Sequence, residues 1–297
     1  MSAEKKAENV RSKEACEERL LRIAEGMSAK EASLLFLQKQ DWDVIRGFHP
    51  QRENAAGWLP MKKTDRVLEL GAGCGAVTGR LCRNAGTVTA LTSSKTLAEA
   101  IRVRHAGKGN LTVETGTALA YLKDISERFN WIVISDEQEL FQDEEALLAL
   151  LKDRLLPDGK LVLGFYNPYG LMFLSGCADP ESGVLFGSLE GNAAGKDGAN
   201  AYRGCRALGP VKEALWRAGF DRVRTFYPFP THVMPNRIFS DEFLPTPGEL
   251  KNDTYSFEHP RIRLFDEQKA WDRILADGEF PRFSNSYFLI AEATWSS

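Results

Sequence analysis

Short apolar segments alternate with longer amphipathic segments along the chain from residue 66 onward. The apolar segments have the lengths of buried strands, and the amphipathic ones have helical periodicity. The predicted strands are 66–71, 87–92, 111–115, 131–135 and 160–166, and the predicted helices between them are 75–84, 94–106, 118–126 and 142–155. Alternating strands and helices favour a parallel sheet with helices on both faces, so the pattern predicts an α/β fold.

The segments before and after this alternation complete the predicted organisation. Residues 1–60 are interpreted as an N-terminal helical cap, with a capping-box signature at Ser28 and Glu31. After the fifth predicted strand, one further helix and two further strands are expected, at 210–218, 222–227 and 286–291. Residues 61–297 are therefore expected to form the sheet domain.

Two long insertions interrupt the sheet domain. Residues 167–207 are rich in glycine and alanine, and residues 228–283 carry several prolines and a predicted helix near 266–276. Segments of this length in a compact domain usually act as lids or binding loops. Both leave the sheet near the carboxyl ends of strands, where ligands of open α/β sheets bind. We interpret them as a roof over a ligand site, with a purely structural cap as the alternative.

A glycine-rich turn follows the first predicted strand and leads directly into a helix. The strand contains Glu69, and glycines follow at Gly71, Gly73 and Gly75. Glycine has no Cβ, so such a turn brings backbone N–H groups and a helix N-terminus close to a ligand. A dinucleotide is one ligand that suits the pattern, because Gly71, Gly73 and Ala76 satisfy the dinucleotide fingerprint G-x-G-x-x-G/A.

Composition narrows the classes of protein and site. The 297 residues carry a formal net charge of −3, which gives no electrostatic reason to expect a nucleic-acid partner. Short basic stretches such as 102–105 are interpreted as solvated helix faces. The 5 cysteines show no C-x-x-C spacing and the 4 histidines are unpaired, so neither disulfides nor a metal site is expected. The chain has no apolar run of about 20 residues, and a cytoplasmic protein is predicted.

The glycine turn and its acidic lead-in resemble motif I of class I S-adenosylmethionine (SAM) methyltransferases. Further matching segments are 50–54, 68–79, 165–171, 227–230 and 283–286. Together they resemble a bacterial subfamily that is associated with surface-glycan or natural-product gene sets. The resemblance implies a Rossmann-like, seven-stranded sheet whose last strand is antiparallel and lies beside the sixth.

The resemblance also implies a cofactor site for SAM. Glu69 would attract the ammonium group of the methionine half, and the backbone of the turn would accommodate its carboxylate. The implied cofactor-binding residues are Glu69, Gly71, Ala72, Gly73, Gly75, Thr92, Ser93, Thr117, Ala118 and Asp136.

Two positions depart from the family pattern. The second strand usually ends in an acid that binds both ribose hydroxyls, and here Thr92 stands in its place. A hydroxyl makes such a bond without the strength that charge adds. The stretch 92–95, Thr-Ser-Ser-Lys, can alternatively hold the 2′-phosphate of NADP, which keeps an NADP-dependent oxidoreductase open. Thr117 is interpreted either as an adenine contact or as a helix N-cap.

Candidate residues for the acceptor side lie at the other strand ends. SAM needs no metal to activate its methyl group, so the protein must position the acceptor and, for a hydroxyl, remove a proton. The catalytic candidates are His232 as general base, with Tyr166 and Asp136; Asp136 and its neighbour Glu137 can instead cap the following helix. The expected acceptor-binding residues are His49, Arg52, Asn167 and Tyr169.

The predicted function is SAM-dependent O-methylation of a small molecule, a sugar or a peptide-derived product, with a carboxylate as one kind of acceptor. An NADP-dependent oxidoreductase and a non-catalytic SAM-fold binding protein are the alternatives. A nucleic-acid methyltransferase is disfavoured by the charge and by the absence of an Asn/Asp-Pro-Pro-Tyr tetrapeptide. The pattern does not define the acceptor or the oligomeric state.

Overall fold

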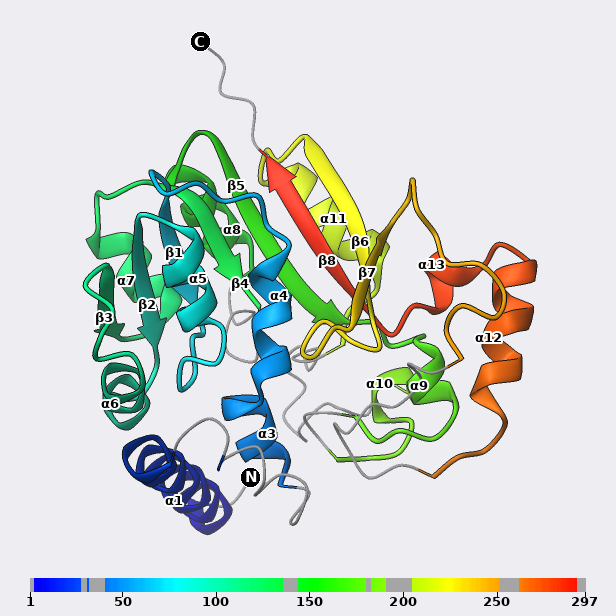
Figure 1. Cartoon of the computed structure of the whole chain (residues 1–297), viewed down its shortest axis with the longest axis horizontal. Coiled ribbons are helices and arrows are strands. Elements are labelled where there is room, and N and C mark those ends of the chain that lie inside the picture. Colours follow the sequence, from blue (N-terminus) through cyan, green and yellow to red (C-terminus); the bar gives the residue numbers. More distant parts are fainter. Residues whose placement is uncertain are drawn as a thin grey trace.

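The computed structural model describes residues 3–27, 31, 41–135, 144–179, 183–190, 205–251 and 262–292, with side chains described from residue 13 onward. Within these residues the chain forms an eight-stranded sheet in the order β3-β2-β1-β4-β5-β8-β6-β7 (Figure 1). The strands are β1 (Arg66–Leu70), β2 (Thr87–Thr92), β3 (Leu111–Thr115), β4 (Phe129–Ile134), β5 (Leu155–Tyr166), β6 (Arg222–Phe229), β7 (Arg237–Ser240) and β8 (Ser286–Glu292).

Helices connect the strands and extend the fold at both ends. Those before and between the first five strands are α1 (Ala3–Gly26), α3 (Trp42–Phe48), the 3-10 helix η1 (Pro50–Glu53), α4 (Asn54–Gly57), α5 (Thr78–Asn84), α6 (Lys95–Arg104), α7 (Ala118–Asp124) and α8 (Glu144–Asp153). Those after β5 are α9 (Leu171–Leu174), α10 (Gly187–Glu190), α11 (Leu208–Arg217), α12 (Glu267–Ala276) and α13 (Phe280–Phe283).

The order and direction of the strands confirm the predicted α/β fold. Strands β1 to β5 pair in parallel, as the alternation of strands and helices predicts. Strand β8 lies between β5 and β6 and is antiparallel to both. The expected antiparallel closing strand is therefore present.

The sheet has eight strands in the described residues, where seven were expected. The additional strand is β7, which pairs antiparallel with β6 from Phe229↔Arg237 to Phe226↔Ser240. Its four residues are all at least partly exposed. Its two apolar residues, Ile238 and Phe239, are adjacent and each is only partly buried against a core, so the four residues show no alternation that would reveal a strand.

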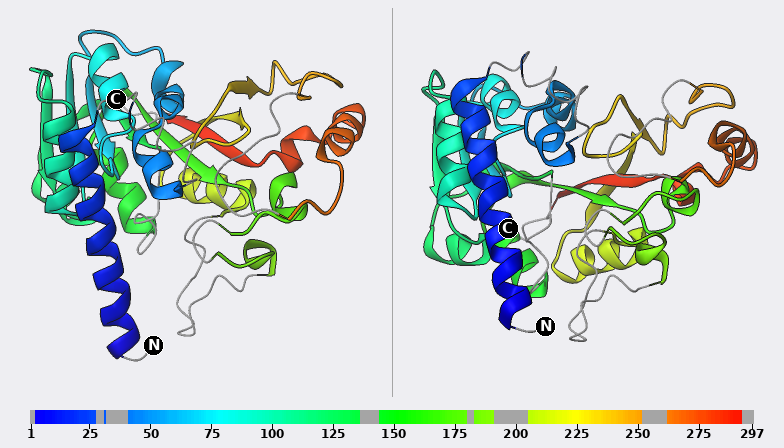
Figure 2. Two further views of the ribbon diagram at one scale, coloured as in Figure 1. Left: turned by 60° about the horizontal axis from the view of Figure 1, so that its bottom comes forward. Right: turned by 90° about the horizontal axis from the view of Figure 1, so that it is seen from below.

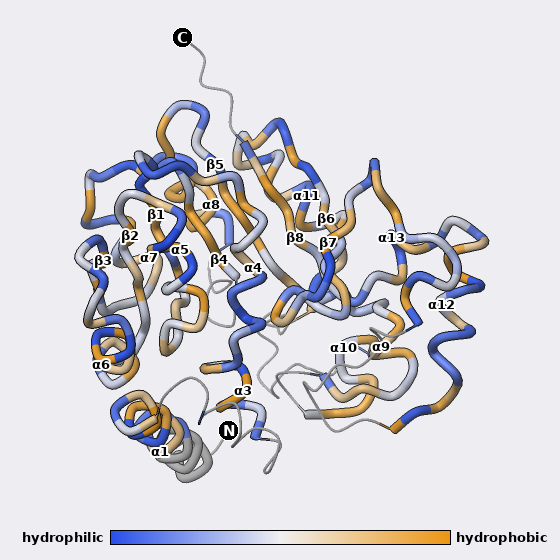
Figure 3. The backbone as a smooth tube through the Cα atoms, viewed as in Figure 1, coloured by the Kyte–Doolittle hydropathy of each residue, from blue (hydrophilic) through white to orange (hydrophobic). Residues whose placement is uncertain are grey.

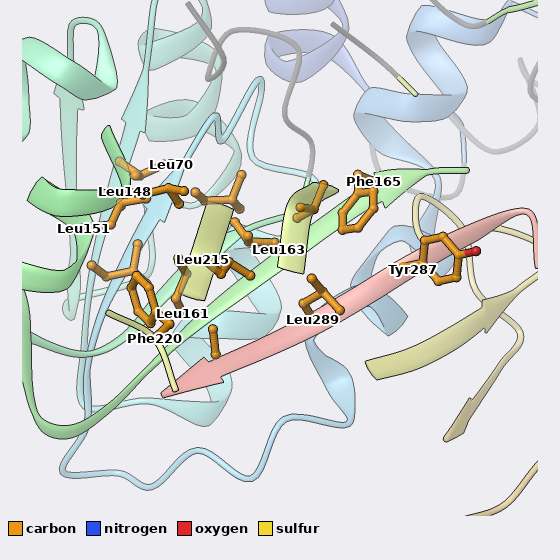
Figure 4. Packing of buried hydrophobic residues seen from close by; sticks show 14 of the residues in the cluster. Leu70, Leu148, Leu151, Leu161, Leu163, Phe165, Leu215, Phe220, Tyr287 and Leu289 are labelled. Atoms are coloured by element: carbon orange, nitrogen blue, oxygen red, sulfur yellow. The ribbon is translucent and has the colours of Figure 1, made fainter. Parts of the chain in front are cut away.

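Side chains alternate between the two faces of the sheet and fill a separate core on each. On one face, Leu68 and Leu70 belong to a cluster with buried residues of α7, α8 and α11 (Figure 4). On the other face, Val67 and Val162 pack with residues of α4 and α5. Hydrophobic residues are concentrated along β4, β5 and β8, the centre of the sheet (Figure 3).

A third apolar cluster covers the carboxyl ends of the strands, and we call it the roof cluster. It joins α1 and α3 to the glycine turn, the end of β5 and the segments that follow β5 and β6. Its buried residues are Leu20, Ile23, Val44, Ile45, Phe48, Cys74, Ala100, Tyr166, Met172, Phe173, Cys177, Cys205, Val233 and Met234. Helix α1 contributes by lying alongside α6 (Figure 2). We propose that residues 1–60 form a cap on the sheet domain and that the insertions at 167–207 and 228–283 cover its ligand site.

Some sequence predictions lie outside the described residues. Ser28 of the capping box is one of them, as are residues 180–182 and 191–204 of the first insertion and residues 252–261 of the second. Among the helices that are described, none has the length and apolar character that crossing a membrane requires.

Candidate functional site

The glycine turn takes a backbone conformation that favours glycine. Gly71, Gly73 and Gly75 have φ angles of 71°, 55° and 82°, in the left-handed region. The N–H of Ala72 donates to the carbonyl of Leu91 at 3.0 Å, so the turn lies against the end of β2. A Cβ placed on Gly73 would meet no heavy atom within 4 Å. The turn therefore leaves open space beside its backbone, as an approaching ligand requires.

Glu69 is fully buried beneath the turn. Its Oε2 accepts a hydrogen bond of 2.6 Å from the hydroxyl of Thr78, at the start of α5. Burial raises the pKa of Glu69 to about 7, although Thr78 and the charges of Arg52 and Arg104 lower it in part. The carboxyl group thus titrates near neutral pH, and a cation bound beside it would stabilise its charged form.

The basic stretch 102–105 is not the solvated helix face that the sequence predicts. Arg104 donates to the carbonyls of Gly47, at 2.5 Å, and Cys74, at 3.4 Å. His105 Nε2 lies 2.9 Å from the carbonyl oxygen of Gly75. Of the four residues only Arg102 is exposed. The prediction was wrong because the end of α6 lies against the glycine turn, and its polar groups bind the carbonyls there.

The carboxylate of Glu17, from helix α1, lies just beyond the end of β2. Thr92 is buried, and its carbonyl accepts from the N–H of Gly116 at 3.0 Å. Ser93 is exposed, while Ser94 caps α6 and its hydroxyl also donates to Oε2 of Glu17 in α1. A phosphate bound at Ser94 would lie beside this carboxylate, which disfavours the NADP alternative.

The segment after β3 contains Thr117 and Ala118, two of the residues that the sequence predicts to bind the cofactor. The hydroxyl of Thr117 accepts from the N–H of Ala120 at 3.4 Å, so of its two interpretations the structure shows the helix N-cap. Ala118 is the first residue of α7 and is half-buried. A Cβ on Gly116 would meet nothing within 4 Å. Asp136 and Glu137 lie outside the described residues, which at this point end with the buried Ser135.

The segment before the sheet contacts the loop after β6. Arg52 is buried and donates to the carbonyl of Val233 at 2.8 Å. Asn54 donates to the carbonyl of Pro235 at 2.8 Å. His49 is the N-cap of η1, and its Nδ1 accepts from the N–H of Gln51 at 3.2 Å. Burial lowers the pKa of its imidazole. Arg52 thus holds a loop, and its charge also acts on Glu69.

The structure brings two catalytic candidates together. The rings of His232 and Tyr166 meet edge to face, with centroids 4.5 Å apart, and both side chains are buried. The ring of His232 also meets that of Phe288, with centroids 6.1 Å apart, and the backbone N–H of His232 donates to Ser286 Oγ at 2.7 Å. A Cβ on Gly164 would come within 2.8 Å of His232 Cδ2. Glycine at 164 therefore makes room for the imidazole over β5.

Asn167 and Tyr169 lie on the loop that follows Tyr166 but have different surroundings. The amide of Asn167 is buried and donates to the carbonyls of Arg282 and Ser284, both at 2.8 Å. It also accepts from the N–H of Tyr169 at 3.1 Å. These bonds tie the loop to α13. The side chain of Tyr169 is 49% exposed.

The arrangement fits the methionine end of SAM. The open space at Gly73 and the buried acid Glu69 suit an amino acid that carries an ammonium group. Among the residues that the structure describes, no three His, Cys, Asp or Glu side chains are grouped as a metal ion would require.

Comparisons with known proteins agree with this arrangement. Residues 67–159 match the model of a methyltransferase domain family. No curated protein sequence matches the chain significantly. Many solved structures share the fold.

Three of these structures illustrate the range of similarity. A chain in the complex that contains the Haloferax volcanii Trm112 methyltransferase activator has a TM-score of 0.51 and 13% identity, over 88% of this chain and 97% of that one. Phosphoethanolamine N-methyltransferase 2 of Haemonchus contortus, in complex with SAM, has a TM-score of 0.50 and 16% identity, over 93% of this chain and 60% of that one. The glycopeptide N-methyltransferase MtfA, in complex with sinefungin, has a TM-score of 0.45 and 18% identity, over 78% of this chain and 81% of that one.

The family match, residues 67–159, covers the glycine turn and nearly all of strands β1 to β4. The chain therefore carries a segment that matches a methyltransferase domain, within a fold that it shares with solved SAM-dependent methyltransferases, and SAM is the cofactor that agrees with both findings.

Proposed function

We propose that the protein transfers the methyl group of SAM to an oxygen atom of a small molecule, a sugar or a peptide-derived product. The observation that carries this proposal is the contact between His232 and Tyr166 at the carboxyl end of β5. A buried imidazole beside a buried phenol is the kind of pair that can accept and orient the proton of an acceptor hydroxyl.

The position of this pair relative to Glu69 supports the proposal. Glu69 is in register with Val133 of β4, which is in register with Val162 of β5, so these three side chains share one face of the sheet. Tyr166 follows Val162 by four residues on the same face, closer to the carboxyl end of the strand. The ammonium-binding acid and the His232–Tyr166 pair therefore line one side of the sheet.

The chemistry follows from this arrangement. SAM, when bound, supplies an electrophilic methyl group on a sulfonium. His232 would take the proton of a hydroxyl acceptor, Tyr166 would orient the acceptor, and the roof cluster around Tyr166 would keep water away. A carboxylate acceptor needs no base, and the buried Arg52 is then the candidate that would position it.

An amine is the competing acceptor, because two of the structural relatives are named N-methyltransferases. At 16 to 18% identity these relatives share the fold alone. The choice between an oxygen and a nitrogen acceptor is tested by the following experiment.

The experiment measures transfer of radiolabelled methyl from SAM to sets of sugars, hydroxylated aromatic compounds and short peptides. Each set contains hydroxyl, carboxylate and amine versions of one scaffold. We expect label on oxygen, with base-labile product for a carboxylate and base-stable product for a hydroxyl. Transfer to the amine versions alone would refute the proposal.

A His232→Phe variant tests the general base, because phenylalanine retains the ring contacts with Tyr166 and Phe288 but has no ring nitrogen. For a hydroxyl acceptor we expect a loss of kcat of about 100-fold or more, the lower range for general-base catalysis, with unchanged affinity for S-adenosylhomocysteine. Wild-type kcat in this variant would remove His232 from the mechanism.

A further inference from the structure

We propose that Glu17, from the N-terminal helix α1, provides the carboxylate that binds the ribose hydroxyls of SAM. The proposal concerns the cofactor site and does not depend on which acceptor the enzyme uses. It assigns a binding residue to the part of the site where the strand sequence itself has no acid.

The end of β2 lacks a charged acceptor of its own. Thr92, the last residue of β2, is buried and carries a hydroxyl only. Ser94, two residues later, donates its hydroxyl hydrogen to Glu17 Oε2. Glu17 is 9% exposed, so its carboxylate is held within the fold. The contact joins residues that are 77 positions apart in the sequence.

The location of this contact is the place where a nucleoside would lie. The glycine turn contacts β2 through the bond from Ala72 N–H to the carbonyl of Leu91. The end of β3 contacts β2 through the bond from Gly116 N–H to the carbonyl of Thr92. A ligand with its amino-acid end over the turn and its nucleoside directed toward β3 must therefore pass the end of β2. In open α/β sheets this strand end is where an acid binds the ribose.

The packing of α1 fixes Glu17 in this position. Leu20 and Ile23 of α1 belong to the roof cluster together with Cys74 of the glycine turn and Ala100 of α6. Leu20 is three residues after Glu17 and so lies on the same side of the helix. The apolar contacts that hold α1 on the turn thus also hold the carboxylate at the start of α6.

The chemistry of a carboxylate matches that of a ribose. Its two oxygen atoms offer about four acceptor positions, so the bond from Ser94 leaves capacity for the two adjacent hydroxyls of a ribose. Bonds to an ionised acceptor are about twice as strong as neutral ones. The same charge would repel a 2′-phosphate, so Glu17 would also select against NADP.

The test is calorimetric titration of the full chain with S-adenosylhomocysteine and with its 2′,3′-dideoxyribose analogue. The variants are Glu17→Gln, which retains an oxygen acceptor for Ser94 but loses the charge, and Glu18→Gln, a control at the exposed neighbouring position. We expect Glu17→Gln to bind S-adenosylhomocysteine about 10-fold more weakly, equivalent to about 1.4 kcal/mol, and Glu18→Gln to bind it as the wild type does. For the dideoxy analogue, wild type and Glu17→Gln should have equal affinities.

Three results would overturn the proposal, and each has a separate meaning. Equal affinity of wild type and Glu17→Gln for S-adenosylhomocysteine would show that the carboxylate does not contact the ribose. Equal weakening for both ligands would show that Glu17 only holds α1 in place. If the wild type bound neither ligand but bound NADP, the cofactor assignment itself would be wrong.

Discussion

Protonation of Glu69 should make cofactor binding depend on pH within the neutral range. Burial raises the pKa of this carboxyl from 4.5 to about 7 in the free protein. Its charged form is the one that attracts an ammonium group, so lowering the pH through 7 should weaken binding. The ligand's own α-amino group loses its charge only at a higher pH, because the neighbouring carboxylate of the amino acid stabilises the ammonium form. Affinity should therefore rise as the pH passes 7 and fall again only where this amine deprotonates.

The size of the effect follows from the pKa. If only the ionised form of Glu69 binds the ligand, the apparent Kd is multiplied by one plus the ratio of protonated to ionised carboxyl. For a pKa of about 7 this factor is about 1.1 at pH 8 and about 11 at pH 6. Binding at pH 7 should release about half a proton from this group.

The same group affects the stability of the free protein with a definite sign. A carboxyl whose folded pKa is raised contributes stability that is fully present below about pH 4.5 and lost as the pH rises through about 7. The difference of about 2.5 pH units corresponds to about 3 kcal/mol. A Glu69→Gln variant, which can still accept from Thr78, should be more stable than wild type at pH 8 by up to about this amount, and equally stable near pH 4.

Calorimetric titration with S-adenosylhomocysteine at half-unit steps from pH 5.5 to 9, in buffers of different ionisation enthalpy, measures both the affinity and the proton release. Urea unfolding at pH 4.5 and pH 8 measures stability. Glu69→Gln should lose the acidic limb of the affinity profile and keep the alkaline limb. A wild-type Kd that stays constant between pH 6 and pH 8 would refute the reasoning.

Two further variants test the turn itself. Gly73→Val adds a branched side chain at a φ of 55°, into the open space beside the turn; it should reduce S-adenosylhomocysteine affinity by more than about 100-fold and destabilise the fold by about 1 to 3 kcal/mol, the usual cost of such strain. Undiminished affinity would mean that the ligand does not approach Gly73. Arg104→Met removes the bonds to the carbonyls of Gly47 and Cys74 and should lower the free energy of unfolding by about 2 kcal/mol. The control is Arg217→Met, because this exposed arginine also ends a ten-residue helix; equal effects in urea unfolding would contradict the assigned role of Arg104.

The sheet could be predicted from the sequence because its strands bury alternating or continuous apolar residues. Strand β1 and the glycine turn are the clearest example, since burial, an acid and three glycines occur together within ten residues. Strand β7 was missed because its four residues are short and only partly buried, with the two apolar ones adjacent. The pattern of apolar and polar residues predicts a strand or helix where the segment packs firmly against the core, and it does not predict one elsewhere.

Contacts between distant segments account for what the sequence did not reveal at the site. Arg104 has the charge of a surface residue, and only the approach of α3 and the glycine turn to the end of α6 makes it a half-buried donor. Glu17 reaches Ser94 from the first helix. The amide of Asn167, which the sequence predicts to bind an acceptor because it follows β5, also contacts α13, more than a hundred residues later. Residue type and sequence position alone do not show which of these side chains contact a distant segment of the chain.

The position of β8 has a consequence for the synthesis of the protein. Of the strands that the structure describes, this one is made last, yet it lies between β5 and β6. Until it emerges from the ribosome, both neighbours have an open edge, and the apolar residues Leu161 and Leu163 of β5 lack a partner strand. From Phe229 to Glu292, at 5 to 20 residues per second, this interval lasts about 3 to 13 seconds. Open apolar edges pair readily with other chains, so the nascent protein is most vulnerable to aggregation just before its last strand arrives.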